Sequence, residues 1–319
     1  MQKVRERLKI IPHFHNHYTF IDLKEDVKSK KVGIHLHLFY VDMADYFIDK
    51  LNNISVKFTL FVSTTNKDDV EDITKNFKEK VNNLEHIEVE VVENRGRDIA
   101  PLIITFGKKL LGFDYICHVH TKKSPHYGKN NWGEHIINTL LGNQSIVNQN
   151  LNILNENGKI IFNEPNFIIP LYNFGWSGDK IFAKELLEKY SHFDINDFPA
   201  IDFPQGSMFW AKIDAMKEFL TLPLSYKDFP TEPLPQDGTI AHALERIMLI
   251  FTSKCPGKAY CIYSDNNPEG FGYYEEQEDF SNYERRYSYI KILSYYLPQF
   301  DTNPVNDAWH GKGFTEWTK

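Results

Sequence analysis

Apolar and polar residues alternate along three short segments in the first third of the chain, a pattern typical of half-buried β-strands. Between these segments apolar residues recur at helical spacing, and Asp68 can cap the second helix. Strands that alternate with helices in this way form a mainly parallel sheet covered by helices. The sequence therefore predicts strands at 32–40, 58–63 and 87–92, with helices at 43–51 and 68–81.

The next stretch, residues 93–124, carries most of the candidate chemistry. It runs from the third predicted strand through a loop and a helix into a strand at 115–121. The C-terminal ends of parallel strands lie on the same edge of a sheet, where ligands of open α/β sheets bind. We expect guanidinium, ammonium, imidazole and hydroxyl groups to meet there, a set that suits an anion such as a phosphate ester. The residues are Asn94, Arg95, Gly96, Arg97, Asp98, His118, His120, Lys122, Lys123 and Ser124.

The loop that opens this stretch also has a structural interpretation. Asp98 precedes Pro101, which fits the first turn of a helix, so the Asp98 carboxylate can be an N-cap, a ligand contact or both. Gly96 tolerates positive φ and lets the backbone turn close to a ligand. The flanking Arg95 and Arg97 can equally belong to a solvated loop.

The histidines leave three roles open. Alternate residues of a strand share a face, so His118 and His120 lie side by side and could ligate a metal, bind a diphosphate or fill the site. Their motif holds no carboxylate or third ligand, and Lys122 and Lys123 supply positive charge without a cation, so we expect no metal. Two further histidines share a face of the first strand and are expected to be polar residues near this crevice: His35 and His37.

The second half of the chain predicts further helices and strands joined by longer loops. Trp176 lies in an aromatic and glycine loop, where it either stacks on a sugar or base or serves as a packing anchor. Gly206 and Ser207 form a turn that leads into a strand with Trp210. Helices are predicted at 132–157, 179–190 and 214–220, and strands at 166–171 and 208–212.

A proline-rich loop at 223–235 leads to Asp237, at the start of another predicted helix. His242, Glu245 and Arg246 follow on this helix, and His242 and Arg246 share a face because they are four residues apart. A carboxylate at the start of a helix that faces a crevice is a candidate general base. The structural alternative is a cap followed by a salt-bridged helix.

Composition narrows the classes of function. With 319 residues and 42% hydrophobic content, the chain can bury a sizeable core. The net charge of −7 and the pI near 6.0 argue against a protein that binds nucleic acid through bulk charge. Three cysteines without metal-ligand spacing fit a reduced, cytoplasmic compartment. No apolar run approaches the roughly 18 residues that span a bilayer, so we expect a membrane-linked substrate to be met from the cytoplasmic side.

Composition changes again beyond Ser264, where Asn, Pro, Gly and acidic residues and then tyrosines accumulate. We therefore predict a lead-in at 1–30, an α/β domain at 31–265 and a linker at 266–289. Residues 290–319 are predicted to be the truncated start of a second domain, opening with a strand at 290–296.

Four motifs, taken in order, resemble the rhamnan synthesis protein F family over about residues 30–265. This family makes rhamnose-containing cell-surface polysaccharides. The motifs are Asn-Arg-Gly-Arg-Asp-Ile-Ala-Pro at 94–101, His-Val-His-Thr-Lys-Lys-Ser at 118–124, Gly-Ser-Met-Phe-Trp at 206–210 and Asp-Gly-Thr-x-Ala-His-x-x-Glu-Arg at 237–246. Separately, the segments 295–300 and 306–318 resemble the opening of the WbsX-type family of polysaccharide loci, whose full domain is similar to a glycoside-hydrolase barrel.

The first resemblance implies a glycosyltransferase with a Rossmann-like, GT-A-like fold, in which helices flank a mostly parallel sheet. It implies a nucleotide-sugar donor, dTDP-rhamnose by the family name, and a glycan acceptor that we expect to be lipid-linked at the cytoplasmic membrane face. GT-A enzymes hold a metal with Asp-x-Asp at a strand end, where this chain has His118-x-His120, so metal dependence does not carry over.

By the same resemblance Asp237 stands where GT-A enzymes keep the carboxylate that activates the acceptor. The ten residues of the 94–98 and 118–124 motifs named above are expected to bind the donor. The residues expected to contact the acceptor or support the site are Trp176, Gly206, Ser207, Trp210, His242, Glu245 and Arg246.

Two alternatives from other classes remain. One is a phosphotransferase of surface-polymer assembly, for which the lysines and histidines are equally suitable. The other is a nucleotide- or carbohydrate-binding module without chemistry. A glycoside hydrolase is disfavoured, because a barrel of about 250 residues does not fit into the chain after Ile290.

Overall fold

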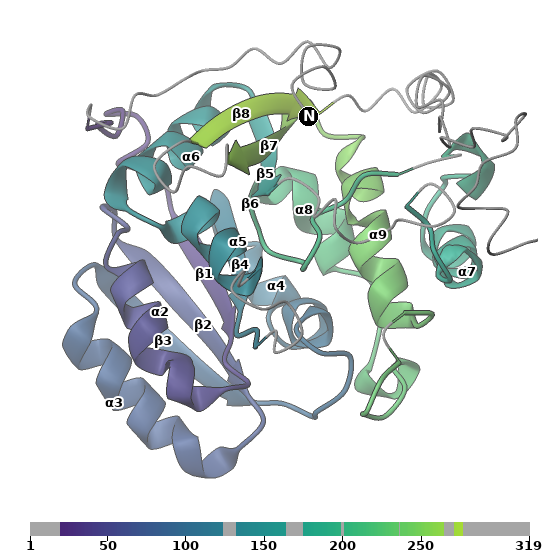
Figure 1. The fold of residues 1–319 in the computed structure, drawn as a ribbon, viewed down its shortest axis with the longest axis horizontal. Coiled ribbons are helices and arrows are strands. Elements are labelled where there is room, and N and C mark those ends of the chain that lie inside the picture. The colour runs from purple at the N-terminus through teal and green to yellow at the C-terminus, as the bar shows by residue number, and fades with distance from the viewer. Residues whose placement is uncertain are drawn as a thin grey trace, which may run out of the picture. The chain divides into compact units, whose positions relative to one another are not determined.

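The computed structural model describes residues 20–123, 132–163, 175–198, 201–235, 237–264 and 271–276. Within these residues eight strands form one sheet, in the order β3-β2-β1-β4-β6-β5-β7-β8 (Figure 1). The strands are β1 (Val32–His37), β2 (Phe58–Thr64), β3 (Leu84–Val91), β4 (Tyr115–His120), β5 (Gly158–Asn163), β6 (Phe209–Lys212), β7 (Lys258–Ser264) and β8 (Phe271–Glu276).

The sheet is mostly parallel. β3, β2, β1 and β4 pair in parallel, as do β5 and β7, whereas β6 runs antiparallel to both β4 and β5, and β8 antiparallel to β7. The chain builds outward from β1 to β3 and then returns to the other side of β1 as β4. Strand order therefore reverses between β1 and β4, which is the switch point at which doubly wound sheets bind ligands.

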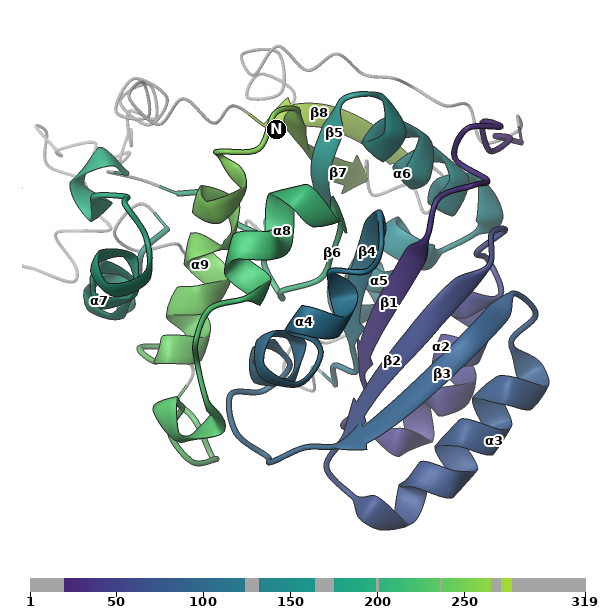
Figure 2. The same cartoon turned by 180° about the vertical axis from the view of Figure 1, so that it is seen from behind.

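Helices cover both faces of the sheet (Figures 1 and 2). α2, α3, α5 and α6 lie on one face, and α4, α8 and α9 lie on the other. The helices are α2 (Ala44–Leu51), α3 (Val70–Lys80), α4 (Gly107–Leu110), α5 (Trp132–Leu141), α6 (Gln144–Glu156), α7 (Lys180–Tyr190), α8 (Ile213–Leu220) and α9 (Ile240–Thr252). Short helical turns occupy Val41–Met43, Lys67–Asp69, Pro101–Thr105, Ile195–Asp197 and Tyr226–Asp228.

The α/β fold class predicted from the sequence is confirmed. The alternating β-α-β-α-β pattern of the first half appears as β1-α2-β2-α3-β3, with bounds within a few residues of those predicted. α2 and α3 are amphipathic, and each buries one apolar stripe, which includes Phe47 on α2 and Phe77 on α3. This burial is what holds the helices on the sheet.

The second half departs from the prediction in four places, one of which is strand β7 at Lys258–Ser264, where no strand was predicted. The single helix predicted at 132–157 is two helices, because Asn143 accepts a hydrogen bond from the Ile146 N–H at 3.0 Å and starts a new helix. Strand β5 follows directly, at Gly158–Asn163, where no strand was predicted. Strand β8 lies inside the range predicted as a linker, 266–289. The strands predicted at 166–171 and 290–296 lie outside the described residues.

The described part of the predicted lead-in, residues 20–30, packs on the domain. Val27 is fully buried in the core, and Leu23 is nearly so. The backbone N–H of Lys24 donates to Asn152 Oδ1 on α6 at 3.0 Å. This segment is therefore part of the α/β unit, earlier in the chain than the predicted start at residue 31.

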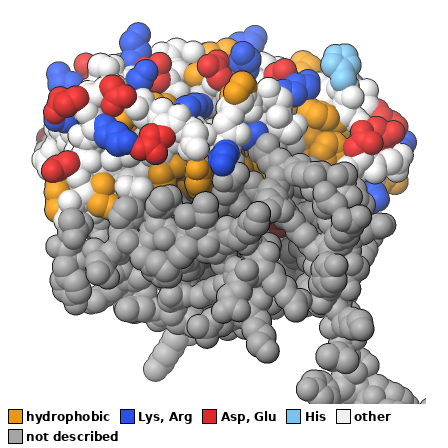
Figure 3. Space-filling model, turned by 90° about the horizontal axis from the view of Figure 1, so that it is seen from above, with side chains coloured by type: hydrophobic (Ala, Val, Ile, Leu, Met, Phe, Trp, Pro, Cys, Tyr) orange, Lys and Arg blue, Asp and Glu red, His pale blue; other side chains and the backbone are white. Residues whose placement is uncertain are grey.

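Surface charge and helix length are the features that would indicate nucleic-acid or membrane partners. Figure 3 shows basic and acidic side chains interspersed over the described part of one face, without a field of a single sign. Among the described residues no helix is both long enough and apolar enough to cross a bilayer.

We predict that Gly107→Ala destabilises the fold at the contact between α4 and α8. A Cβ at Gly107 would lie 2.1 Å from the Leu220 carbonyl oxygen, which is backbone and cannot move alone. We expect the free energy of unfolding to fall by about 1–3 kcal/mol, measured by urea denaturation. Gly112→Ala is the matched control, because its Cβ would be 3.6 Å from the nearest atom. Equal stability of the two variants would contradict the close helix contact.

Candidate functional site

A cavity of about 900 Å³ lies at the C-terminal ends of β1 and β4, at the switch point of the sheet. Its size is that of pockets that take small-molecule ligands. Two segments predicted to line one crevice, the loop after β3 and the end of β4, do meet here. The predicted site residues that line the cavity are Asn94, Arg97, Asp98, His120, Lys122, Lys123, Gly206, Ser207, Asp237, His242, Glu245 and Arg246.

The two lysines after β4 differ in their surroundings. Lys123 is exposed, and its ammonium group forms an ion pair with Asp42 Oδ2 at 2.6 Å and lies over the Tyr40 ring. Lys122 is half-buried and, within the described residues, its ammonium group forms no ion pair. Its charge acts on the nearby Glu245 carboxyl without forming an ion pair with it, so the ammonium group can still pair with an anionic ligand. Lys122 is therefore the stronger candidate for binding an anionic group.

Arg97 connects the loop after β3 to the opposite wall. Its guanidinium donates to His242 Nε2 at 3.0 Å and to the Pro235 carbonyl at 3.2 Å. Its backbone has φ of +53°, a left-handed conformation that is uncommon outside glycine and occurs at functional sites. The loop thus holds Arg97 across the cavity.

Arg95 and Gly96 do not line the cavity, in contrast to the prediction that they bind a donor. The Arg95 guanidinium donates to the Phe229 carbonyl, and Arg95 forms a backbone bridge with Thr231. Gly96 has φ of +69°, and a Cβ there would lie 2.5 Å from the Phe229 ring. Both residues fasten the loop to the segment after α8, so their role in the structure is architectural.

Asp98 is buried and directs its carboxylate at β4. Its Oδ2 lies 3.2 Å from His118 Nε2, and its Oδ1 lies 3.9 Å from His120 Nε2. It forms no capping bond to the helical turn that follows, so the N-cap alternative is not the one adopted. Burial alone raises the pKa of the Asp98 carboxyl, but the attraction of His120 and the hydrogen bond from His118 outweigh it and hold that pKa well below its usual range.

Four buried histidines surround this carboxylate, because β1 and β4 pair His35 with His118 and His37 with His120. Burial lowers the pKa of His35 well below its usual value, lowers that of His37 to about 3 and also lowers that of His118. His118 itself does not line the cavity. These three rings are therefore neutral at physiological pH.

A turn between the histidines and α9 closes one side of the cavity. Gly206 and Ser207 have φ of +84° and +60°. The Gly206 carbonyl accepts from His120 Nε2 at 2.8 Å, and its N–H donates to Glu245 Oε1 at 2.6 Å. Burial raises the pKa of the Glu245 carboxyl, with Arg246 and Lys122 opposing the rise. Glu245 thus holds the turn against α9.

Arg246 joins two carboxylates on the remaining wall. Its guanidinium forms ion pairs with Asp179 Oδ2 at 2.5 Å and with Asp237 Oδ1 at 2.9 Å. Asp237 Oδ2 accepts from the Gly178 N–H at 2.9 Å. Both oxygens of Asp237 are therefore fixed, and the side chain remains partly exposed at the cavity.

The sequence suggested that Asp237 caps α9, but in the structure it does not. Thr239 is the N-cap residue, and Asp179 Oδ1 accepts from the N–H groups of Gly238 and Thr239 at 2.9 and 3.1 Å. Burial raises the pKa of Asp179 to about 7. Burial also acts to raise the pKa of Asp237, but its contacts with Asp179, Gly178 and Arg246 lower it overall. The two carboxyl groups titrate as a pair, and the outer one, Asp237, stays ionised.

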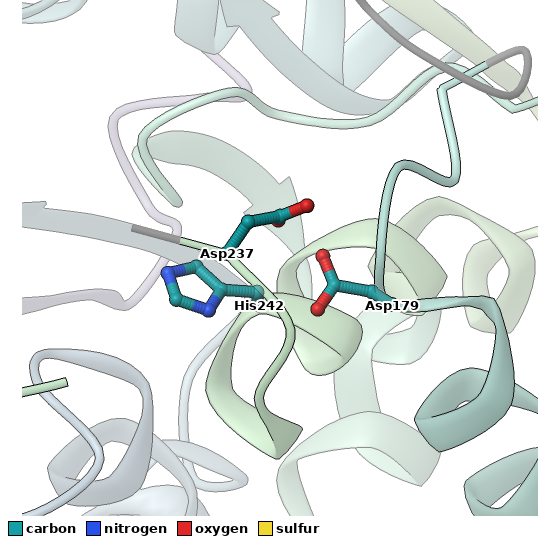
Figure 4. Close-up of side chains that lie close together, drawn as sticks. All are labelled: Asp179, Asp237 and His242. Atoms are coloured by element: carbon teal, nitrogen blue, oxygen red, sulfur yellow. The ribbon is translucent and has the colours of Figure 1, made fainter. Parts of the chain in front are cut away.

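Asp179, Asp237 and His242 are a group of potential metal ligands among the described residues, with ligand atoms within 4.8 Å of one another. Figure 4 shows the two carboxylates facing each other while the imidazole of His242 points away. Both nitrogens of His242 already have partners, Arg97 at Nε2 and Thr239 Oγ1 at Nδ1, the latter at 2.8 Å. Burial lowers its pKa to about 4. These contacts favour an ion-pair network over a metal site.

Two predicted tryptophans lie away from the cavity. Trp176 is fully buried and donates through Nε1 to the Phe198 carbonyl at 2.9 Å, so it is a packing anchor. Trp210 is fully buried on the opposite face of the sheet and donates to the Leu140 carbonyl of α5 at 3.1 Å. Neither can contact a ligand in this structure. Ser124 lies outside the described residues.

Several lining residues were not predicted to belong to the site. His37, which was expected to lie near this crevice but was given no role in the site, does line the cavity. Asp179, which holds Arg246, is fully buried and does not line the cavity, and its only sequence signal was its position before a helix. Several others carried no sequence signal and reach the cavity through the fold, among them Phe39, Tyr40, Trp132, Phe203, Gln205 and Glu232.

An α/β sheet with a cavity at its switch point, lined by cations and carboxylates, fits a glycosyltransferase-like class, and the family comparisons support that class. Residues 9–254 match the family model described as rhamnan synthesis protein F. The chain therefore belongs to the rhamnan synthesis protein F family, as its motifs indicated. Residues 292–319 match a second model, described as glycosyltransferase WbsX, in the order expected.

Two curated relatives are similar to the chain, both called uncharacterized protein WxcX, from Xanthomonas campestris pv. campestris strains B100 and ATCC 33913. Each is 29% identical over 231 residues, which cover 71% of this chain and 32% of the relative. The chain thus spans about a third of the length of the curated relatives it matches. A crystal structure of S. aureus TarS 1-349 aligns with a TM-score of 0.36 and 12% identity, over 76% of this chain and 60% of that one.

The neutral histidines predict that acid destabilises the fold. Their folded pKa values lie below the value of about 6.5 for an exposed histidine, so below that pH the unfolded chain binds more protons. The free energy of unfolding therefore falls as the pH falls below about 6.5, by up to about 1.4 kcal/mol per pH unit for each histidine. Urea denaturation between about pH 7.5 and 5 measures this slope.

His37→Gln tests one histidine of the three. It should reduce the slope between about pH 6 and 5 by about one proton. Val62→Ala on the neighbouring β2 is the control, because its side chain is fully buried and carries no titratable group. It should lower stability equally at each pH. A slope that His37→Gln leaves unchanged would contradict a neutral His37.

Proposed function

We propose that this protein is a glycosyltransferase of cell-surface polysaccharide synthesis, which transfers a sugar from a nucleotide-sugar donor to a glycan hydroxyl. The observation that carries this proposal is the cavity at the switch point. Its lining includes Lys122, which forms no ion pair among the described residues, and the fixed, ionised carboxylate of Asp237. Such a reaction needs a cation for the leaving diphosphate and a base for the attacking hydroxyl. Membership of the rhamnan synthesis protein F family supports the same class.

Lys122 is proposed to bind the diphosphate of the donor. Its ammonium group is half-buried and has no ion partner among the described residues, and Lys123 and Arg97 add positive charge around it. Their charges stabilise the diphosphate as it departs, and no metal ion is required for that step in this proposal. Asn94, which is exposed at the rim, and Asp98 are proposed to orient hydroxyl groups of the donor.

Asp237 is proposed to be the general base. Its carboxylate is ionised, faces the cavity and is held by Arg246 and the Gly178 N–H. In the proposed step the acceptor hydroxyl gives its proton to Asp237, and its oxygen bonds to the anomeric carbon of the donor. The bond from that carbon to the diphosphate oxygen breaks, and the diphosphate leaves with the electron pair.

The finer assignments follow the family name. Rhamnose, carried by dTDP-rhamnose, is the proposed donor sugar, and a lipid-linked glycan is the proposed acceptor. The reaction is proposed to take place in the cytoplasm, with peripheral association at the inner face of the membrane.

We predict that Asp237→Asn lowers turnover by about 10²–10⁴-fold while donor binding is retained, because the amide keeps the shape but cannot take the proton. The assay is release of nucleoside diphosphate from dTDP-rhamnose, UDP-glucose and GDP-mannose, by transfer to water or to added glycan. Asp214→Asn, on an exposed part of α8, is the matched control and should keep full activity. If Glu245→Gln loses turnover and Asp237→Asn does not, the base is Glu245. A phosphodiester product would show that the protein is a phosphotransferase and not a glycosyltransferase.

We predict that Lys122→Met weakens binding of the same nucleotide sugars by about 10- to 100-fold, because a charge-assisted hydrogen bond is lost. Lys123→Met should have a smaller effect, since its charge is shared with Asp42. Isothermal titration with and without Mn²⁺ after chelation measures both. Lys254→Met, which affects an exposed pair with Glu218, is the control. If chelation abolishes binding, the proposal that Lys122 binds the diphosphate without a metal ion is wrong.

A further inference from the structure

Five buried side chains beside the cavity form one continuous row of hydrogen bonds. The row links Asp98 Oδ2 to His118 Nε2 at 3.2 Å, and His118 Nδ1 to His35 Nδ1 at 2.9 Å. It continues from His35 Nε2 to Ser63 Oγ at 3.1 Å and ends with Ser63 Oγ to His37 Nδ1 at 2.8 Å. The members come from the loop after β3 and from β4, β1 and β2, so only the assembled sheet creates the row.

The chemistry of each group sets the direction of every bond in this row. An ionised carboxylate only accepts, so His118 Nε2 donates to Asp98. A neutral imidazole has one N–H and one lone pair, so His118 Nδ1 accepts from His35 Nδ1. His35 Nε2 then accepts from the Ser63 hydroxyl, which has one proton and accepts in turn from His37 Nδ1. The row ends with a bare lone pair on His37 Nε2.

Two observations support this assignment. The 2.9 Å separation of the two Nδ1 atoms of His35 and His118 leaves room for one proton between them, not two. Burial also lowers the pKa of His35, His37 and His118, which keeps each ring neutral and restricts it to a single N–H.

His37 is the histidine of the row that a ligand in the cavity can contact. It lines the cavity, as Asp98 does at the other end, whereas Ser63, His35 and His118 do not. Within the described residues His37 Nε2 has no hydrogen-bond partner. The neighbouring His120 directs both nitrogens at carbonyl oxygens, of Gly206 at 2.8 Å and of Thr121 at 3.1 Å. The cavity therefore offers the ligand one imidazole nitrogen that can only accept.

We propose that His37 determines specificity by accepting a hydrogen bond from a hydroxyl group of the ligand, and that Ser63, His35, His118 and Asp98 are positioning residues that fix its tautomer. This assignment deepens the proposed glycosyltransferase and rests on it. Phosphate oxygens are acceptors at neutral pH and meet no donor at His37, so the diphosphate belongs at Lys122. The hydroxyl at His37 belongs to the sugar.

The tautomer can be measured without any ligand. In protein labelled with nitrogen-15 histidine, long-range proton–nitrogen spectra distinguish a nitrogen that carries hydrogen from one with a lone pair. The His37 signal is identified by its loss in His37→Gln. We expect Nδ1–H and a bare Nε2 in the wild type. Hydrogen on Nε2 would overturn the proposal.

Ser63→Ala separates a positioning role from mere packing. With the hydroxyl gone, His37 Nδ1 loses its partner, and we expect the ring to exchange between its two tautomers. Ser55→Ala is the matched control, because its hydroxyl donates to Asn148 Oδ1 at 2.6 Å, outside the row. The control should keep the wild-type His37 spectrum. A Ser63→Ala spectrum identical to the wild type would also overturn the proposal.

Titration with dTDP-rhamnose, UDP-glucose and GDP-mannose, and with deoxyfluoro analogues of each sugar, tests the contact itself. Fluorine keeps the size of a hydroxyl but cannot donate, so one analogue should bind about 10-fold more weakly. Ser63→Ala should reduce this discrimination below about 3-fold. If no analogue binds more weakly, or if the loss persists in His37→Leu, whose side chain cannot accept a hydrogen bond, the role of His37 fails while the proposed function stands. If no nucleotide sugar binds, the proposed function fails, and this assignment fails with it.

Discussion

The register between β1 and β4 is the constraint on which the site depends. It sets His35 opposite His118 and His37 opposite His120, so four imidazoles share one face at the switch point. A slip of one residue would turn each of them to the other face of the sheet. Because buried polar groups need partners, this placement requires a carboxylate and a hydroxyl nearby. Asp98 and a serine on β2 supply them, which ties the loop after β3 and three parallel strands to one hydrogen-bonded arrangement.

The opposite wall depends on a buried cation. Arg246 on α9 pairs with Asp179 before α7 and with Asp237 in the loop before α9. Removing one member of such a buried group leaves an uncompensated charge, which costs about 3–5 kcal/mol. The network therefore fixes the position of Asp237 more strictly than a helix cap would. It also explains why Asp237 stays ionised beside another carboxylate, since the inner residue takes any shared proton.

Local patterns predicted the first half of the fold well and the second half less well. Polar–apolar alternation in β1 to β3 and amphipathic spacing in α2 and α3 are local to each element, so the bounds of these elements could be predicted. Helical spacing of apolar residues continues through Asn143, so the sequence did not reveal that Asn143 caps a new helix. The motifs predicted which segments meet, but not which side chains face the cavity. Arg95, Trp176 and Trp210 are polar or aromatic enough for a site, and only tertiary packing turns them away from it. The backbone N–H groups of Gly238 and Thr239, just before α9, donate to Asp179, which is far away in sequence, so this contact has no local signal.

The charged groups of the cavity differ in how far other side chains neutralise them. Lys123 and Arg246 are neutralised by carboxylates beside them, and Arg97 is engaged with His242. Among the described residues of the cavity, this leaves two cations without an ion-pair partner, the half-buried Lys122 and Arg97, whose own partners are neutral. The floor at β1 presents a neutral ring instead. The proposed donor, which joins an anionic diphosphate to a polyol, would match this arrangement better than either part alone.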